Sequence, residues 1–323
     1  MKRYIFYLLI ITILGINSCS TKIELDIPES PEQIAVQGIL LPDSLIYVGI
    51  TKTQPISNNN PFLSVNDASV ELWSNGVFIE YLTHWNNGIY KSSVIAQPSA
   101  NYEIFVNVPG FEMIYASTSI PENVTITSGT IKPDSYYDSQ QMDYVSEVEI
   151  SFNDPPQEKN YYQITFYSYQ FKSIMYDYET GGFIVIDSTK TNFTELDYLN
   201  SQDPVIINEG DLGFYQDPFC IKSLVFSDEL LKNDSTVSFL VGGITCMGCL
   251  GQMPVVVLRS ISPDYYKFHK SLIRQSYNQG LRSFFIDDLF YTINPNDLYT
   301  NIENGLGIFS GYSQTEFELI KVE

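Results

Sequence analysis

Short runs of alternating apolar and polar residues, each ended by glycine, proline, asparagine or aspartate, follow one another through most of the chain. Val70 to Trp73 alternates, reaches Asn75-Gly76, and resumes at Val77. Asn-Gly between two such runs predicts a β-hairpin, because both residues tolerate the positive φ that a two-residue turn needs. The repetition of this pattern at short intervals predicts an all-β protein built from antiparallel sandwiches.

The turn signals divide the β-rich part of the chain into two tandem domains. Candidate strands from Ile34 to Thr118 end at Ile120-Pro121, so we assign residues 34–122 to an N-terminal β-sandwich. Residues 123–323 then form a second β-rich domain, whose first strand is the alternating run around Val148. Both domains have frequent turns and few long apolar segments, so we predict the same fold class, an all-β sandwich, for each.

One segment of the second domain follows a helical period instead. Ser262 is the predicted N-cap, Pro263 the first helical residue and Gly280 the stop, which places one amphipathic helix near residues 263–279. Its apolar face, expected to pack on the second sandwich, consists of Tyr265, Tyr266, Phe268, His269, Leu272, Ile273 and Tyr277. Its polar face, expected to be solvated, consists of Lys267, Lys270 and Arg274.

The first nineteen residues have the pattern of a bacterial lipoprotein leader. Two positive charges precede an apolar run from Tyr4 to Ile16, which is too short for a comfortable membrane span. Ile16, Ser18 and Cys19 then match the lipobox, in which a small residue precedes the lipidated cysteine. We therefore expect residues 1–18 to be a signal peptide, Cys19 to carry palmitate and related acyl chains, and residues 19–33 to form a tether.

Composition narrows the possible functions. The net charge is -21, and it becomes -23 when Lys2 and Arg3 leave with the signal peptide. Such a charge repels nucleic acid, so nucleic-acid binding is excluded. Aromatic residues make up 14% of the chain. They fit half-buried strand surfaces, and some of them suit binding surfaces.

The remaining cysteines offer several alternatives. Cys246 and Cys249 form a CxxC motif, for which we expect a local disulfide, with a bridge from Cys220 to one of the pair as an alternative. Two unpaired thiols are also compatible with the sequence. A redox site would need a βαβ context that the pattern denies, and a zinc site would need two further ligands.

No motif for catalysis, metal binding or cofactor binding is found, so we expect no enzyme activity. His84 and His269 are the two histidines, and neither has a serine or cysteine motif placed to use it as a base. The aspartate-rich stretches lack the spacing of a calcium loop.

Several short motifs, in a fixed order, resemble the domain-of-unknown-function family 4249 (DUF4249) of envelope lipoproteins. They are Ile23 to Pro28, Ile34 to Gly38, Asp67 to Leu72, Gly88 to Tyr90, Val257 to Ser262 with Tyr265 and Tyr266, and Asn301 to Phe309. The resemblance covers nearly the whole mature chain and implies no catalytic residues. By analogy of fold, the first domain resembles transthyretin-like or immunoglobulin-like modules. Asp43-Ser44-Leu45, Asp187-Ser188-Thr189 and Asp234-Ser235-Thr236 resemble an O-glycosylation signal of related envelope proteins.

The resemblance implies a function in the cell envelope. We expect a non-enzymatic lipoprotein, held in the outer membrane through Cys19, that is an accessory partner of a TonB-dependent β-barrel transporter. We expect aromatic loops of the second domain to contact the transporter, around Tyr136-Tyr137 and Phe214-Tyr215. The alternative is a surface lipoprotein that binds glycan or peptide through exposed aromatics. A flat apolar patch would favour a protein partner, whereas a groove with exposed tyrosine or tryptophan would favour a ligand.

Overall fold

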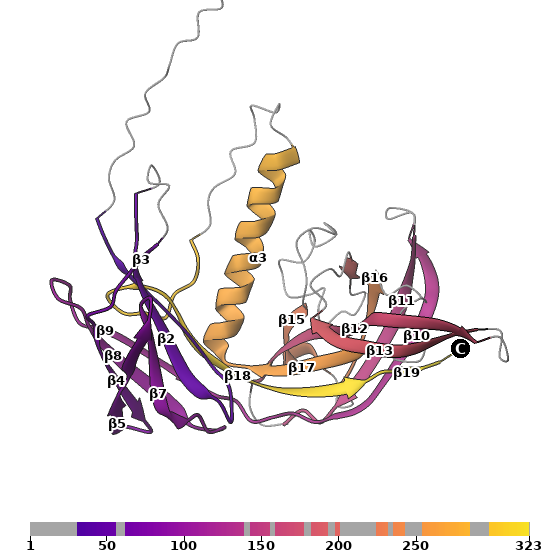
Figure 1. The fold of residues 1–323 in the computed structure, drawn as a ribbon, viewed down its shortest axis with the longest axis horizontal. Coiled ribbons are helices and arrows are strands. Elements are labelled where there is room, and N and C mark those ends of the chain that lie inside the picture. Colours follow the sequence, from indigo (N-terminus) through magenta and orange to yellow (C-terminus); the bar gives the residue numbers. More distant parts are fainter. Residues whose placement is uncertain are drawn as a thin grey trace, which may run out of the picture.

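The computed structural model describes a β-rich protein with one long helix (Figure 1). The described residues are 31–55, 62–138, 143–155, 159–177, 182–192, 198–200, 224–231, 235–242, 254–284 and 297–322. The prediction of an all-β sandwich fold is confirmed. Cys19, Cys220, Cys246, Cys249 and Phe214-Tyr215 lie outside the described residues.

Two facing sheets form the N-terminal sandwich. Its strands are β1 (Ile34–Leu40), β2 (Leu45–Lys52), β3 (Leu63–Ser64), β4 (Ser69–Ser74), β5 (Val77–Tyr81), β6 (Thr83–Asn86), β7 (Ile89–Ile95), β8 (Asn101–Asn107) and β9 (Ile114–Ser119). One sheet has the order β5-β4-β8-β9, and β1, β2, β7 and β6 belong to the sheet that faces it. Alternate residues of these strands point inward, so Ile46, Ile50, Leu72 and Ile104 are fully buried between the sheets.

Asn-Gly turns are present at two places in this sandwich, and the one at Asn75-Gly76 is the predicted turn. Asn75 and Gly76 have φ values of 49° and 75°, and Asn87 and Gly88 have φ values of 43° and 75°. Both pairs therefore adopt the left-handed backbone that joins strands of a tight hairpin. At Gly88 a Cβ atom would lie 2.4 Å from the carbonyl oxygen of Ile50, so the second turn also needs glycine for space.

A second pair of sheets forms the other sandwich. Its strands are β10 (Ile126–Asp138), β11 (Asp143–Phe152), β12 (Tyr161–Asp177), β13 (Gly182–Asn192), β14 (Tyr198–Asn200), β15 (Leu224–Ser227), β16 (Thr236–Gly242), β17 (Val255–Ile261) and β19 (Ile320–Lys321), with the short 3-10 helix η2 (Asp228–Leu230). One sheet has the order β14-β16-β11-β10-β19. Tyr162, Phe166, Phe226 and Phe239 are buried between it and the sheet that contains β12 and β17.

Strand β18 (Leu306–Glu318) belongs to both sandwiches. Its first half pairs in parallel with β1, and its second half, from Tyr312, pairs antiparallel with β17. One ten-stranded sheet therefore contains strands of both sandwiches. In Figure 1, β18 is the long yellow strand that passes from one sandwich to the other. Phe309 contributes to the first core, whereas Phe317 packs on the second. The domain boundary near residue 122 stays a prediction. Strand β18 comes after this boundary in the sequence, but it pairs with a strand from each side of it, β1 and β17.

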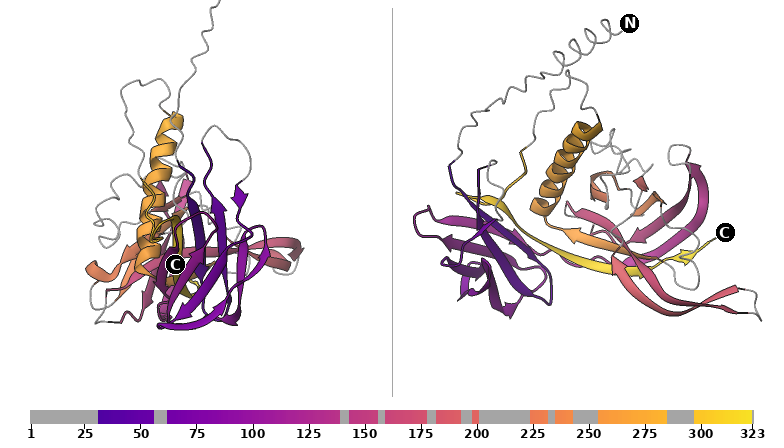
Figure 2. Two further views of the ribbon diagram at one scale, coloured as in Figure 1. Left: turned by 90° about the vertical axis from the view of Figure 1, so that its left-hand side faces the viewer. Right: turned by 45° about the horizontal axis from the view of Figure 1, so that its top comes forward.

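Helix α3 (Pro263–Phe284) stands over β18, between the two sandwiches (Figure 2). The backbone N–H of Tyr265 donates to Ser262 Oγ over 3.3 Å, as expected of an N-cap. The prediction of a stop at Gly280 was wrong, because the helix continues to Phe284. Glycine inside a helix costs only about 1 kcal/mol, so it does not end a helix by itself.

The predicted solvated face of α3 also needs a correction. Lys270 is buried, and its ammonium lies 5.5 Å from the ring centroid of Tyr266, one helical turn earlier. Residues four apart share one side of a helix, so the tyrosine ring covers the lysine stem. Lys267 and Arg274 are exposed as expected.

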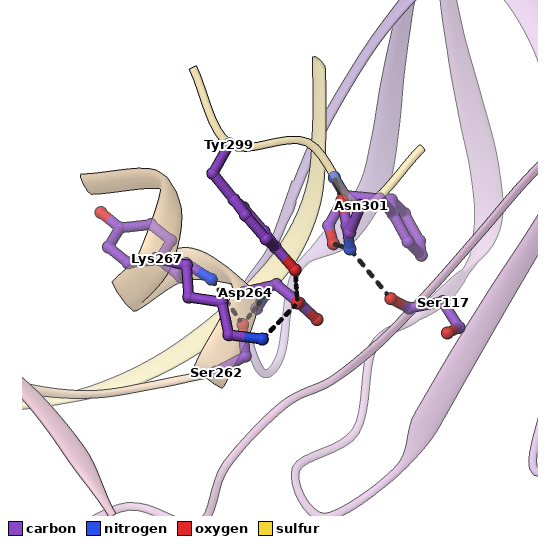
Figure 3. A network of polar contacts seen from close by, with 9 residues as sticks. Ser117, Ser262, Asp264, Lys267, Tyr299 and Asn301 are labelled. Atoms are coloured by element: carbon purple, nitrogen blue, oxygen red, sulfur yellow. Dashed lines mark hydrogen bonds and ion pairs between the residues drawn. The ribbon is translucent and has the colours of Figure 1, made fainter. Parts of the chain in front are cut away.

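A polar network joins α3 to the segment that leads into β18 (Figure 3). The Tyr299 hydroxyl donates to Asp264 Oδ1 over 2.5 Å, and the Tyr299 backbone N–H donates to Ser271 Oγ over 2.9 Å. The Lys267 ammonium lies 5.2 Å from the Tyr299 ring centroid. Burial and then the Asp264 carboxylate raise the pKa of Tyr299, so its hydroxyl keeps the proton that it donates.

Asn301 continues this network to the N-terminal sandwich. Its Nδ2 donates to the backbone oxygens of Phe309 and Ser117 over 2.7 Å and 3.1 Å, and its Oδ1 accepts from the Phe309 N–H over 3.0 Å. The side-chain amide therefore pairs with β18 as a neighbouring peptide would, at a point before the ladder to β17 begins. The segment before β18 fixes the helix, the shared strand and β9 together.

Candidate functional site

A continuous row of aromatic rings covers the outer face of the β5-β4-β8-β9 sheet. The row, here called the aromatic face, consists of Tyr81, Phe78, Trp73, Phe105 and Tyr115. Consecutive ring centroids along it lie 5.3, 5.6, 5.9 and 5.0 Å apart. These separations are those of interacting aromatic pairs, so the rings support one another and form one surface.

Strand alternation places these rings outside the core. Val70 and Leu72 on β4 are buried, so the side chain of Trp73 lies on the opposite side of the sheet. The same alternation on β8, where Ile104 and Val106 are buried, sends Phe105 outward. On β4 and β8 the aromatic face therefore follows from a period of two, with aromatic residues at outward positions where a solvated sheet would carry polar ones. On β5, Phe78 and Tyr81 are three residues apart, and an irregularity in the β4–β5 ladder places them opposite Trp73 and Glu71.

Glu71 fixes two members of the aromatic face. One carboxylate oxygen accepts from Trp73 Nε1 over 3.0 Å, and the other accepts from the Tyr81 hydroxyl over 3.2 Å. The charge of Glu71, followed by this hydrogen bond, raises the pKa of Tyr81, so the tyrosine stays protonated. The polar atoms of both rings are thus engaged; Tyr81 is exposed, and Trp73 is half-buried.

The edge strand β5 carries further exposed apolar residues. Val77 and Tyr81 are 61% and 58% exposed, and Ile79 is also exposed. Within the described residues, β5 pairs with β4 alone and so leaves a sheet edge uncovered. Glu80 anchors the strand, because its carboxylate accepts from the backbone N–H groups of Ser93 and Val94 over 2.7 Å and 3.2 Å.

The predicted contact at Tyr136-Tyr137 forms a smaller aromatic group. Both rings are about half exposed at the end of the β10–β11 hairpin, and the Tyr137 centroid lies 5.2 Å from that of Tyr144. Ser44, in an O-glycosylation-like signal, is exposed in the turn between β1 and β2. Ser188 belongs to β13, and Ser235 precedes β16.

Both histidines have structural surroundings. His84 Nε2 lies 3.0 Å from Asn66 Oδ1, which also accepts from the Gly88 N–H. His269 stacks on Tyr265 with 4.4 Å between centroids. Burial, followed by the charge of Arg259, lowers the pKa of His269 to about 4, so its ring is neutral at pH 7. Within the described part of the chain, no hydrogen bond joins either ring to a serine.

No helix of the described ranges is long and apolar enough to cross a bilayer. No three side chains of the histidine, cysteine, aspartate or glutamate type gather there as metal ligands would.

The aromatic face was missed in the sequence, although a signal for it exists. Two alternating runs, Val70 to Trp73 and Tyr102 to Val106, carry an aromatic residue at a position where the alternation predicts a polar, outward-facing side chain. These residues are Trp73 and Phe105. Aromatic residues in strands are usually half buried, so the alternation alone predicts packing and not an exposed row. Comparison of the outward positions of neighbouring strands would have shown the row, but that comparison needs the strand order, which the sequence does not contain.

The comparisons with known proteins place the chain in a family. The crystal structure of Parabacteroides merdae β-glucuronidase with glycerol in its active site is 11% identical, with a TM-score of 0.23. The match covers 72% of this chain but only 23% of the glucuronidase, and a likeness this weak carries no argument. Among functionally described proteins, none matches the chain. The sequence model of the DUF4249 domain of unknown function matches residues 20–318, so the chain belongs to the DUF4249 family.

Proposed function

We propose that this protein is a non-enzymatic lipoprotein of the outer membrane that docks onto a TonB-dependent β-barrel transporter through the aromatic face. The observation that carries the proposal is the row of rings from Tyr81 to Tyr115, extended by the uncovered edge of β5. Contiguous apolar surface of this kind is rare on the exterior of a monomer and marks interaction sites. Aromatic residues are also enriched in the cores of protein interfaces.

The shape of the surface favours a protein partner over a sugar. The rings lie on the face of a sheet rather than in a groove. The Trp73 ring is tilted by 75° to that of Phe78 and by 67° to that of Phe105. Neighbouring rings therefore do not share a plane, so they provide no continuous platform on which successive sugar rings could stack.

Anchoring at Cys19 strengthens a modest interface. Fifteen residues, 19–33, separate the lipid site from β1. A fully extended chain of that length spans at most about 50 Å. The sandwiches therefore stay close to the bilayer, where a barrel in the same membrane is present at high effective concentration. The family resemblance supplies the identity of the proposed partner.

The proposal is tested by purification of the tagged, lipidated protein from gently solubilised membranes, with quantification of any co-purifying barrel protein. We expect Phe78→Ser/Tyr81→Ser to lose the barrel, because both rings are exposed and the change removes apolar contact area without emptying the core. The matched control is Tyr136→Ser/Tyr137→Ser, which removes two equally exposed rings from the second sandwich. Cys19→Ala should lose membrane attachment.

Three results would contradict the proposal. The wild-type protein could emerge alone while a known barrel–lipoprotein pair survives the same detergent. The aromatic-face variant could keep the barrel while the Tyr136→Ser/Tyr137→Ser control loses it, which would move the contact to the second sandwich. A bound glycan or peptide without any barrel would favour a ligand-binding lipoprotein.

A further inference from the structure

The dipeptide Asn-Gly occurs three times in the chain, and the structure describes each copy: Asn75-Gly76, Asn87-Gly88 and Asn304-Gly305. Asparagine before glycine is open to deamidation, because glycine has no side chain to keep the asparagine amide away from the next backbone nitrogen. In an unfolded chain the three copies are chemically alike. Any difference between their reactivities in the native protein therefore comes from the fold.

The reaction takes place within the two residues and consumes only water. The glycine nitrogen attacks Cγ of the asparagine, so a bond from N to Cγ forms and the bond from Cγ to Nδ2 breaks. The proton of the glycine N–H passes to Nδ2, which leaves as ammonia. Water then opens the cyclic imide at either of its carbonyl carbons and yields aspartate or isoaspartate. A glycine N–H that donates a hydrogen bond must first give up that bond, so such a bond protects the asparagine.

The pair Asn75-Gly76 is open to this attack. Both residues are exposed in the turn between β4 and β5. Among the described residues, the Gly76 N–H has no hydrogen-bond partner. A Cβ atom added at Gly76 would meet nothing within 4 Å, so the peptide group of the turn has room to rotate toward the asparagine side chain.

The neighbouring strand also assists the reaction at Asn75. The backbone N–H of Asn101 donates to Asn75 Oδ1 over 3.1 Å, and the Asn75 N–H donates to the Asn101 oxygen over 2.9 Å. Oδ1 gains negative charge when nitrogen attacks Cγ, and a fixed N–H donor stabilises that charge. In the described part of the chain, Asn75 Nδ2 is held by no acceptor, so it is free to leave.

The Gly88 nitrogen is held and enclosed, unlike that of Gly76. The Gly88 N–H donates to Asn66 Oδ1 over 2.8 Å, and Gly88 is buried. The position of its missing Cβ lies 2.4 Å from the Ile50 oxygen, so the peptide group has no room to rotate. Asn87 itself is exposed, which shows that exposure of the asparagine alone does not decide reactivity.

The third copy, Asn304-Gly305, is held through its leaving group. Asn304 Nδ2 donates to the Met113 oxygen over 2.9 Å, so departure of ammonia would break this bond. The missing Cβ of Gly305 lies 2.9 Å from the Ile34 oxygen, so this peptide group is crowded as well.

We propose that Asn75 is the site at which the native protein deamidates, and that the fold protects Asn87 and Asn304. The aspartate product adds a negative charge beside the aromatic face. The isoaspartate product adds one backbone carbon to a two-residue turn whose length sets the pairing of Trp73 with Phe78. The end of β5 should therefore loosen. The reaction needs no partner, so it is independent of the proposed docking.

The test follows the full mature chain during incubation at mildly alkaline pH, with peptide mass spectrometry that separates asparagine, aspartate and isoaspartate. In urea, the three copies should convert at rates within about threefold of one another. In the native protein, conversion of Asn75 should be at least about tenfold faster than that of Asn87 or Asn304. Hydrogen exchange of the β5 amides should become about tenfold faster in the isoaspartate fraction.

Two substitutions at the exposed Asn66 test the reason for the protection of Asn87. Asn66→Ala removes the acceptor of the Gly88 N–H, so conversion of Asn87 should become about fivefold faster or more while Asn75 is unchanged. Asn66→Asp is the matched control, because its carboxylate still accepts this bond. Melting temperatures show that both variants are folded.

Four results would overturn the proposal. The three copies could convert equally in the native protein, or Asn75 could convert in urea and stay intact in the native protein. Asn87 could remain as slow in Asn66→Ala as in Asn66→Asp, or β5 could keep its exchange rates after isoaspartate forms.

Discussion

The amide of Asn301 offers a direct test of how the shared strand is held. Asn301→Ala removes three hydrogen bonds, two of them to the backbone of the fully buried Phe309. A neutral hydrogen bond contributes about 1 kcal/mol net, and a buried polar group left without a partner costs a further 1–3 kcal/mol, roughly. We therefore expect the free energy of unfolding to fall by about 3 kcal/mol.

Urea unfolding at 25 °C, followed by circular dichroism, measures this change. Asn107→Ala is the matched control, since Asn107 is exposed at the end of β8. An exposed substitution of this kind changes stability by less than about 0.5 kcal/mol. If Asn301→Ala costs less than about 1 kcal/mol, the neighbouring chain supplies the bonds in another way, and the assignment of Asn301 as a substitute for a missing strand is wrong.

Two further substitutions test electrostatics and space. Because the pKa of His269 is lowered to about 4, the unfolded chain binds a proton before the folded chain does as the pH falls from 7 to 5. The free energy of unfolding of the wild type, measured in urea, should therefore fall by up to about 2 kcal/mol over this range. His269→Phe keeps a ring that can stack on Tyr265 and should not show this loss. An identical pH dependence in both proteins would refute this. Gly307→Ala should lower the free energy of thermal unfolding by at least about 3 kcal/mol, because the new Cβ would lie 2.0 Å from the Val36 backbone oxygen. Gly110 also has a positive φ but has open space around it, so Gly110→Ala should lower the free energy of unfolding by only about 1 kcal/mol.

Local features of the fold could be predicted from the sequence because they depend on neighbouring residues. The turn at Asn75-Gly76 and the N-cap at Ser262 have the conformations expected of their residue types. The stop at Gly280 failed, because one internal glycine costs only about 1 kcal/mol and does not end a helix by itself. Lys270 was placed on the wrong face, because its long apolar stem lets it lie under Tyr266.

Long-range features could not be predicted in the same way. The pairing of β1 with β18 joins residues from opposite ends of the chain, and alternation gives no information about which strands become neighbours. The same limit hid the aromatic face, since its rings come from four strands.

The parallel pairing of β1 with β18 also sets an order of events in time. During synthesis β1 is made early, but its partner strand and the core side chain Phe309 arrive only when nearly the whole chain exists. Until then the N-terminal sandwich has an uncovered edge next to β1 and an incomplete core, a state that is prone to aggregation. Contacts between such distant residues also slow folding. The first domain along the chain is therefore among the last parts of the molecule to be completed, and a chain shortened before Leu306 should yield neither sandwich in finished form.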